Sequence, residues 1–266
     1  MADAMMATAA HEVLTATPLT GTFGALVHGA DLTQAHATQT RAVNSLLDRY
    51  KVLVFREQHR VGPDELLAFS SGFGAPETAD HPSHPNYPGL PGVKVLKSDI
   101  SHRRYLPDSW HTDGATRERT RCITVLQAVD IPSYGRDTLF ADMEAAYDEL
   151  SETMKAFLDP LSAEHSWGMA KPDAPPVAHP LIHTHPATGR KAIYANRLYT
   201  RRILGLTDTE NRLILEYLLT RTQTPEHQLR VSWAPGTIVM WDNERTQHYL
   251  VYDQDYPRVM HRCMMF

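Results

Sequence analysis

The sequence predicts a mainly β protein with flanking helices, in which many short strands form a sandwich or barrel. Short apolar segments recur along the chain and are interrupted by Gly and Pro, as is typical of such folds. A few stretches show instead the apolar spacing of an amphipathic helix. With 266 residues and 42% hydrophobic side chains the chain can bury a sizeable core, and all-β folds of this length commonly form one domain.

The first part of the chain predicts alternating strands and helices. Residues 15–30 contain apolar segments broken by glycines, which predicts short strands joined by tight turns. Apolar residues between 43 and 50 fall at helical spacing and predict an amphipathic helix. The run VLVF (52–55) predicts a buried strand, and Pro63 suits the first position of a second helix.

Short strands dominate the pattern from about residue 93 onward. We expect strands at VKVL (93–96), CITVLQAV (122–129), KAIYAN (191–196), LRVSW (229–233), TIVMW (237–241) and RVMHRCMM (258–265).

Two helical stretches interrupt these strands. One covers about residues 143–158, and the other begins at Thr207. In the second, Leu213, Tyr217 and Leu218 are predicted to share one apolar face.

The chain shows neither internal repeats nor a low-complexity tract, so we expect one domain over residues 1–266. Residues 1–12 are expected to be flexible. Residues 168–180 are rich in Pro and small residues and predict a loop.

Composition narrows the classes of partner. The formal net charge of -5 offers no basic field for nucleic acid. No segment approaches the roughly 20 apolar residues of a membrane helix, and the first ten residues lack the features of a signal peptide, so we expect a cytoplasmic protein. The two cysteines, Cys122 and Cys263, are expected to be buried or free thiols. The sequence leaves the oligomeric state open, a homo-oligomer included.

The WHTD segment (110–113) places His111 and Asp113 two residues apart. Positions i and i+2 of an extended chain face the same side, so both groups can reach one ion. His248, just after the strand predicted at 237–241, supplies a second imidazole. Two histidines and one carboxylate with open coordination positions are typical of non-haem Fe(II) oxygenases.

The residues alone leave other interpretations of this pattern open. A His-x-Asp pair also arises from hydrogen bonding within a loop. The pair His183 and His185 has the same spacing and an equal formal claim to a metal.

Two arginines follow His248 on the last predicted strand. Arg258 and Arg262 would point to the same face of that strand. A keto acid needs a cation for its distal carboxylate, and arginine supplies a planar donor with two prongs. Thr138, in the GRDTLF segment, is a candidate hydroxyl donor beside it. A surface ion pair is the alternative for either arginine, but two on one face of an otherwise apolar strand favour binding.

On these motifs the sequence resembles the taurine dioxygenase family of α-ketoglutarate oxygenases. The matching segments, spread over nearly the whole chain, are TPLTGTFGALVHGADLT, VLVFREQ, FGAPE, HPNYP, WHTD, GRDTLF, HPLIHTHPATGRKAIYAN, VSWAPGTIVMWDN, TQHY and RVMHR. The combination of WHTD, WDNxxTQH and RVMHR is the most specific.

The resemblance implies a double-stranded β-helix (jelly-roll) core with helices packed outside. It implies Fe(II) ligation by His111, Asp113 and His248, with α-ketoglutarate as cosubstrate and O₂ as oxidant. By the same comparison His183 and His185 are not ligands.

The resemblance also implies roles in binding the two acids. Arg258, helped by Thr138, is expected to bind the C5 carboxylate of α-ketoglutarate. Arg262 is expected near the anionic group of the substrate or near the cosubstrate.

For the substrate, the family comparison implies a pocket for a small acid. His84 and Tyr87 of the HPNYP segment match substrate-binding residues of the family. Trp167 and Tyr199 match aromatic residues that line the pocket. The comparison implies that GRDTLF belongs to a helix and that Trp167 follows it. Ordinary core packing is the alternative for these two aromatics.

Three departures from the family pattern put taurine itself in doubt. Pro107 stands where taurine-specific members carry an asparagine. Gly114 follows the aspartate where a larger side chain is common, which is expected to open space or add flexibility beside the metal. The stretch from Trp167 to His179 is short, so part of the usual lid is expected to be missing.

Three functions follow from these observations. The leading one is hydroxylation of a small anionic substrate, such as a sulfonate, sulfate ester or carboxylate, with release of succinate and CO₂. The second keeps the cofactors but desaturates or oxidatively decarboxylates an amino-acid-derived natural-product intermediate. The third is a metal-binding jelly roll without turnover, a sensor, and the presence of Arg258 and Thr138 argues against it.

Overall fold

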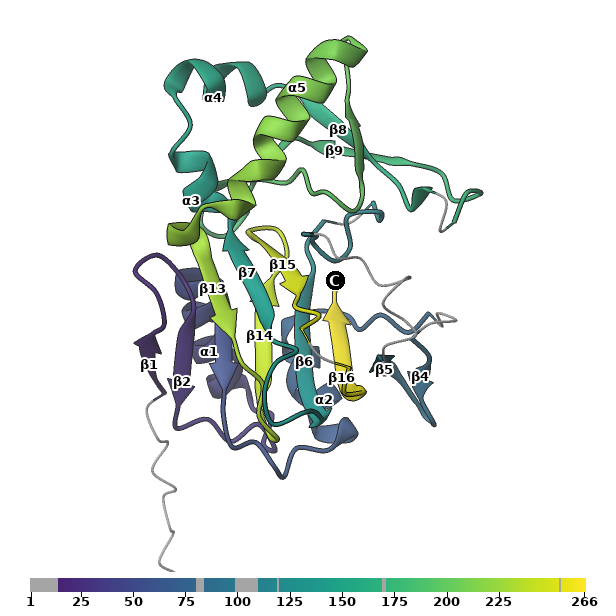
Figure 1. Cartoon of the computed structure of the whole chain (residues 1–266). Coiled ribbons are helices and arrows are strands. Elements are labelled where there is room, and N and C mark those ends of the chain that lie inside the picture. Colours follow the sequence, from purple (N-terminus) through teal and green to yellow (C-terminus); the bar gives the residue numbers. More distant parts are fainter. Residues whose placement is uncertain (1–13, 80–83, 99–109, 119, 169–170, 254) are drawn as a thin grey trace, which may run out of the picture.

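The computed structural model describes residues 14–266 apart from 80–83, 99–109, 119, 169–170 and 254. The start predicted to be flexible therefore lies outside the described residues, as does Pro107. The larger of the two central β-sheets has eight strands in the order β1-β2-β3-β14-β6-β16-β5-β4 (Figure 1). These strands are β1 (Thr15–Pro18), β2 (Ala25–His28), β3 (Val52–Phe55), β4 (Asn86–Tyr87), β5 (Leu90–Ser98), β6 (Ile123–Asp130), β14 (Ile238–Asp242) and β16 (Arg258–Met265).

The smaller central sheet packs on one face of the larger. Its middle strand β7 (Thr138–Asp142) pairs with β13 (Gln228–Val231) and β15 (Thr246–Leu250). Side chains alternate between the two faces of a strand, and the inward set of both sheets forms one buried core. Phe140 of β7 and Trp241 of β14 meet there edge to face, with ring centroids 5.3 Å apart.

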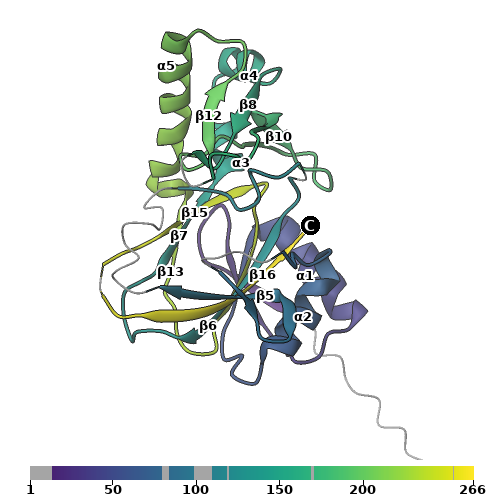
Figure 2. The same cartoon turned by 90° about the vertical axis from the view of Figure 1, so that its right-hand side faces the viewer.

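Helices cover the opposite face of the larger sheet. They are α1 (Ala37–Tyr50) and α2 (Pro63–Ser70), continued by the short helix η1 (Ser71–Phe73) (Figures 1 and 2). Their buried side chains share a core with the outward-pointing residues of β3, β6, β14 and β16. The larger sheet is therefore buried on both faces, which accounts for its nearly continuous apolar strands.

A further group of elements lies beyond one end of the two sheets, at the top of Figure 1. Its helices and strands share a separate buried core. These elements are α3 (Met143–Asp148), α4 (Glu152–Leu158), β8 (Ser162–His165), β9 (Val177–Pro180), β10 (Ile182–Thr184), β11 (Lys191–Ile193), β12 (Thr200–Ile203) and α5 (Asp208–Leu219), followed by η4 (Thr220–Gln223) and η5 (Pro225–His227).

The sequence predicted most of these elements. The opening strands and helices are confirmed, and each of the six later strand segments contains a strand. The predicted helix at 143–158 is wrong in one respect, because it is divided into α3 and α4 where Ser151 caps α4. The loop predicted at 168–180 is also partly wrong, since it contains β9, and Thr138 begins a strand rather than lying in a helix.

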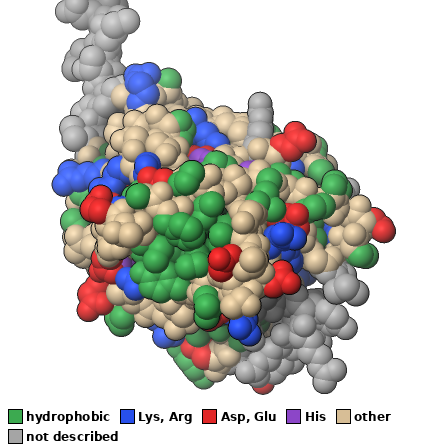
Figure 3. All heavy atoms as spheres, turned by 90° about the horizontal axis from the view of Figure 1, so that it is seen from above, with side chains coloured by type: hydrophobic (Ala, Val, Ile, Leu, Met, Phe, Trp, Pro, Cys, Tyr) green, Lys and Arg blue, Asp and Glu red, His purple; other side chains and the backbone are tan. Residues whose placement is uncertain are grey.

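The apolar face predicted for α5 is only partly correct. Leu218 is buried, but Leu213 and Tyr217 are 62% and 39% exposed. The helix instead turns Ile214 and Leu215 toward the core. Figure 3 looks onto this end of the molecule and shows hydrophobic side chains gathered on its surface.

Two smaller expectations concern cysteines and membranes. Cys122 and Cys263 are buried free thiols, as predicted. Among the helices of the described ranges, none has the length and apolar character needed to cross a bilayer.

A buried network of charges joins the end of α1 to α3 and to the turn between β14 and β15. Lys51 donates hydrogen bonds to Asp142 at 2.7 Å and to Glu144 at 3.2 Å. Arg245 Nε donates to the other oxygen of Glu144 at 2.7 Å. Burial alone raises the pKa of Glu144, but the bonds from Arg245 and Lys51 outweigh it and hold the pKa below its ordinary value.

We expect Glu144→Gln to lower the free energy of unfolding by about 3–5 kcal/mol, because it leaves buried cations without their shared carboxylate. Chemical denaturation followed by circular dichroism measures the change. Glu152→Gln is the matched control, because its side chain is 90% exposed and its ion pair with Lys155 is at the surface. Equal effects of both substitutions would show that the network does not stabilise the fold.

Candidate active site

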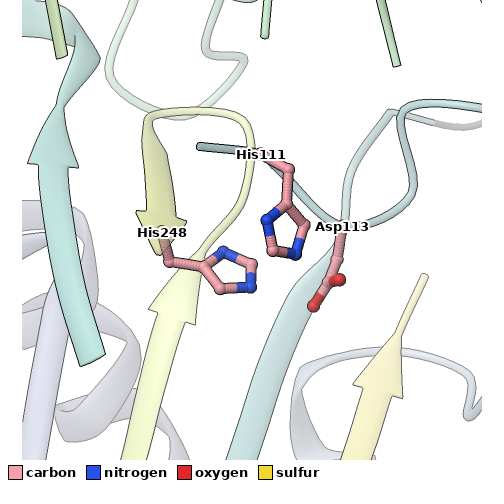
Figure 4. A group of neighbouring side chains, drawn as sticks. All are labelled: His111, Asp113 and His248. Atoms are coloured by element: carbon pink, nitrogen blue, oxygen red, sulfur yellow. The ribbon is translucent and has the colours of Figure 1, made fainter. Parts of the chain in front are cut away.

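The two histidines of the predicted metal site lie side by side because a short backbone pairing joins their segments. The N–H of His111 donates to the carbonyl of His248 at 3.1 Å, and the N–H of His248 donates back at 2.8 Å. His248 lies within β15 rather than after a strand, and it pairs with Phe140, whose side chain belongs to the core between the sheets. The two imidazole rings are 4.1 Å apart between centroids (Figure 4).

Asp113 completes the group. Its carboxylate and the two imidazoles point toward a common space, although His248 comes from a segment far from His111 and Asp113 in the sequence (Figure 4). One ligand atom from each of the three residues lies within 4.8 Å of the other two. The three side chains can therefore hold one metal ion.

The electrostatics of this group suit a cation. Burial alone raises the pKa of Asp113, but Arg262, the two histidines and the Thr124 hydroxyl lower it to about 2. Burial, helped by His111, lowers the pKa of His248 to about 3. At neutral pH Asp113 is thus ionised and His248 is neutral, and these are the protonation states that metal ligands require.

Arg258 is a buried cation at the start of β16, on the same face of that strand as Arg262. Its Nη1 donates to the carbonyl of Arg136 at 3.1 Å, two residues before Thr138. Burial, together with the charge of Arg136, lowers the pKa of Arg258 to about 10. Among the described residues no carboxylate lies within ion-pair distance of it, so its charge is available to an anionic ligand.

Arg262 lies closer to the metal group. Its Nη1 is 3.6 Å from Oδ1 of Asp113, and its side chain is 17% exposed. Thr138, the predicted partner of Arg258, accepts a hydrogen bond from Nε1 of Trp233 at 3.1 Å and is buried between β13 and β15.

The profile of the family described as "Taurine catabolism dioxygenase TauD, TfdA family" matches residues 15–264. The chain belongs to this family.

Similar proteins support the same assignment. An α-ketoglutarate-dependent sulfate ester dioxygenase of Pseudomonas putida is 30% identical over 288 residues, which cover 100% of this chain and 94% of that protein. A pentalenolactone F synthase of Streptomyces avermitilis is 34% identical over 260 residues, covering 85% and 84%. The crystal structure of a taurine dioxygenase from Burkholderia xenovorans superposes with a TM-score of 0.84 at 30% identity, covering 95% of this chain and 89% of the other. The chain is therefore an α-ketoglutarate-dependent dioxygenase with the predicted jelly-roll core.

In this TauD-family chain, Asn243 connects the metal group to the β14–β15 turn. Its Oδ1 accepts hydrogen bonds from the backbone N–H of Asp113 at 2.9 Å and from Nε1 of Trp241 at 3.0 Å. Its Nδ2 donates to Oγ1 of Thr124 at 2.9 Å, and Thr124 in turn donates to Oδ2 of Asp113 at 2.9 Å. Sequence reasoning quoted the WDN motif but gave neither Asn243 nor Thr124 a role. The signal that it missed was a run of polar residues, DN, directly after the apolar strand segment TIVMW.

The predicted aromatic residues lie beside the metal group of this TauD-family site. The ring of Tyr199 is 6.2 Å from that of His111 between centroids, and Trp167 packs on Tyr199 at 5.2 Å. Burial raises the pKa of Tyr199, and the Asp113 charge adds to it, so the phenol stays neutral. Trp167 and Tyr199 thus form one aromatic wall leading to His111.

Tyr87 does not lie beside the metal group. Its ring packs on His261, with centroids 5.3 Å apart. His261 and Arg262 are neighbours on β16 and point to opposite faces, so Tyr87 lies across the larger sheet from Arg262. His84 is half-buried just before β4. The substrate-binding roles of His84 and Tyr87 stay predictions.

Gly114 has a different explanation from the one expected. Its φ of +81° lies in the left-handed region, which a residue with a side chain rarely adopts. A Cβ here would lie 3.2 Å from Cβ of Cys122 and 3.3 Å from the Phe266 ring. The glycine permits a close-packed turn after Asp113, and the expected open space beside the metal group is filled at this position.

We expect Asn243→Ala to weaken binding of Mn²⁺ by about 10- to 100-fold, because Asp113 loses the amide that orients its backbone. Isothermal titration with the chelator-treated protein measures the affinity. Asn44→Ala on α1, whose amide bonds only to Asp48 among the described contacts, is the control and should bind like the wild type. Unchanged affinity in Asn243→Ala would contradict an orienting role.

Proposed function

We propose that His111, Asp113 and His248 hold one Fe(II) and that this site hydroxylates a small anionic substrate. The observation that carries the proposal is the convergence of these three ligands in the space between the sheets. Buried Arg258 and partly exposed Arg262 lie on the strand β16 that borders this space. Two imidazoles and one carboxylate leave coordination positions open for other ligands. The donor set and its protonation states fit Fe(II).

The cosubstrate in this proposal is α-ketoglutarate, with its distal carboxylate on Arg258. A guanidinium in a water-poor interior interacts strongly with a carboxylate, because little solvent screens the pair. The Arg136 carbonyl already fixes one prong of Arg258 and so orients the group before the ligand arrives. Thr138 stays a predicted helper, since its hydroxyl already serves Trp233.

When bound, iron, α-ketoglutarate and O₂ supply the oxidising chemistry, and the by-products are succinate and CO₂. The chain's own residues position the reactants and exclude water. Trp167 and Tyr199 form an apolar wall beside His111, which favours the carbon skeleton of the substrate over solvent. Arg262 offers a cation for the acidic head of the substrate at the edge of the metal group.

The substrate class follows from this charge. Arg262 is a partly exposed cation beside Asp113 of the metal group, so a sulfonate, sulfate ester or carboxylate fits beside it. The similarity to a sulfate ester dioxygenase supports a small acid. We further propose that one catalytic domain carries this activity and that it acts in the cytoplasm.

A second function keeps the same cofactors and changes the outcome. The similarity to a pentalenolactone F synthase favours action on a biosynthetic intermediate, by desaturation or oxidative decarboxylation. Mass spectrometry separates the two outcomes: hydroxylation adds one oxygen atom, and desaturation removes two hydrogen atoms.

We expect Arg258→Gln to raise the α-ketoglutarate concentration needed for half-saturation by about 10- to 100-fold, because it removes a charge-assisted hydrogen bond. The readout is the visible absorption band of the anaerobic Fe(II)–α-ketoglutarate complex. Arg202→Gln, an exposed arginine on β12, should behave as the wild type. A band whose dependence on α-ketoglutarate is unchanged in Arg258→Gln would show that another residue binds the distal carboxylate.

Substitution of Arg262 separates substrate binding from cosubstrate binding. A panel of sulfonates, sulfate esters and carboxylates is screened for succinate formation with the wild type. With the substrate found, Arg262→Gln should raise its KM by about 10-fold or more, since one ion-paired hydrogen bond is lost. Slow succinate formation without substrate should persist. Equal loss of both activities would assign Arg262 to Asp113 or the cosubstrate instead.

A further inference from the structure

A second cluster of metal-ligating side chains lies in the described part of the chain, apart from the His111 group. His185 follows β10, Asp242 ends β14, and Glu244 lies in the turn to β15. One ligand atom from each lies within 4.8 Å of the other two. The three residues are only 6%, 5% and 3% exposed. A closed, buried set of nitrogen and oxygen donors differs from an acidic patch on the surface, and structural metal sites have this character.

The buried carboxylates around this cluster are unequally paired. Four of them face three cations in direct ion pairs of the described network, and exposed Arg121 acts on Glu244 from further away. The carboxylates are Asp142, Glu144, Asp242 and Glu244, and the cations are Lys51, Arg190 and Arg245. Arg190 is half-exposed and also pairs with Asp148 at the surface. Among the described residues Glu244 has no direct ion pair with a lysine or arginine, and a buried carboxylate without such a pair is costly.

Glu244 has one satisfied and one unsatisfied carboxylate oxygen among the described contacts. Its Oε1 accepts a hydrogen bond from Oγ1 of Thr120 at 2.9 Å. Its Oε2 is buried and has no hydrogen-bond donor among the described residues, and Nε2 of His185 lies 3.9 Å away. Burial raises the pKa of Glu244, and the neighbouring Asp242 raises it further. An unpaired carboxylate oxygen thus faces an imidazole and a second carboxylate.

His185 is held so that its Nε2 faces both carboxylates. Nε2 lies 3.1 Å from Oδ2 of Asp242, and Nδ1 lies 3.1 Å from Oγ1 of Thr188. When the Thr188 hydroxyl accepts the Nδ1 proton, the Nε2 lone pair points at the carboxylates, as in metal-bound histidines. In the other tautomer, which carries the proton on Nε2, the backbone N–H of Thr188 donates to Nδ1 at 3.3 Å.

His183 lies beside the cluster. Its Nε2 lies 3.8 Å from Oε1 of Glu244. The His183-Thr184-His185 pair therefore meets the acidic turn of the WDNE segment, although the resemblance to the family gave it no role.

We propose that His185, Asp242 and Glu244 bind a second divalent cation, Zn²⁺ by preference, with His183 completing the site. Ligand atoms around a tetrahedral Zn²⁺ lie about 3.3 Å apart for bonds of about 2.0 Å. The separations from Nε2 of His185 to Asp242 and Glu244, 3.1 and 3.9 Å, reach that geometry with small side-chain rotations. The ion neutralises Glu244 and ties the β10–β11 hairpin to the β14–β15 turn.

The test isolates this site from the His111 group. The double variant His111→Ala/His248→Ala, stripped of metal with a chelator, is titrated with Zn²⁺ against a chromophoric chelator and with Co²⁺ by visible absorption. We expect one tight equivalent, Co²⁺ bands of a nitrogen and oxygen site, and a rise in Tm on adding Zn²⁺, since the ion binds only the folded chain. Adding Glu244→Gln, which keeps the side-chain shape, should abolish all three effects.

Matched variants control this result. Adding Glu226→Gln, an exposed glutamate on η5, should leave the equivalent in place. His185→Gln repeats the test independently should Glu244→Gln disturb the circular dichroism spectrum. Absence of binding in the double variant overturns the proposal, because a protonated His185 or Glu244 then balances the charge. Binding that survives both Glu244→Gln and His185→Gln overturns it equally.

Discussion

The two backbone hydrogen bonds between His111 and His248 are the contact on which the active site depends. They join the WHTD segment to β15, and β15 is itself fixed by pairing with β7 in the smaller sheet. Because Asp113 is two residues beyond His111 on an extended segment, the same pairing delivers its carboxylate as well. A site made from distant segments needs such a backbone register, since side-chain contacts alone leave the chain free to shift.

The turn between β14 and β15 contacts both the metal group and the His185 cluster. Asn243 points toward Asp113 and Thr124, whereas Asp242 and Glu244 point toward His185. Arg245, next in the chain, connects the turn to the buried charge network through its ion pair with Glu144. Four consecutive residues are thus held by partners from different parts of the fold. A rigid turn of this kind fixes the start of β15 and hence the position of His248.

Sequence reasoning reached the parts of this structure that depend on local pattern. The helix over residues 43–50 followed from apolar periodicity, and the strands at 52–55 and 258–265 followed from short apolar runs. The convergence of His111, Asp113 and His248 followed from motif spacing and family resemblance. It failed for segments whose structure is determined by tertiary contacts. β15 was missed because its buried side chains are polar: Thr246 and Gln247 donate to the carbonyls of Asp242 and Ala195, partners that no sequence period reveals. The exposure of Leu213 likewise depends on which side of α5 the neighbouring core covers.

The two arginines of β16 show how one strand supports two different tasks. Arg258 is enclosed and held by a backbone carbonyl, so its charge has no fixed anion among the described residues and is oriented for one. Arg262, four residues further along β16 and closer to the metal group, is partly exposed and already lies beside a carboxylate that is also a predicted ligand. Screening by solvent weakens an exposed pair far more than a buried one. The deeper arginine therefore suits a cosubstrate that stays in place through a reaction, and the shallower one suits an acid that must enter and leave.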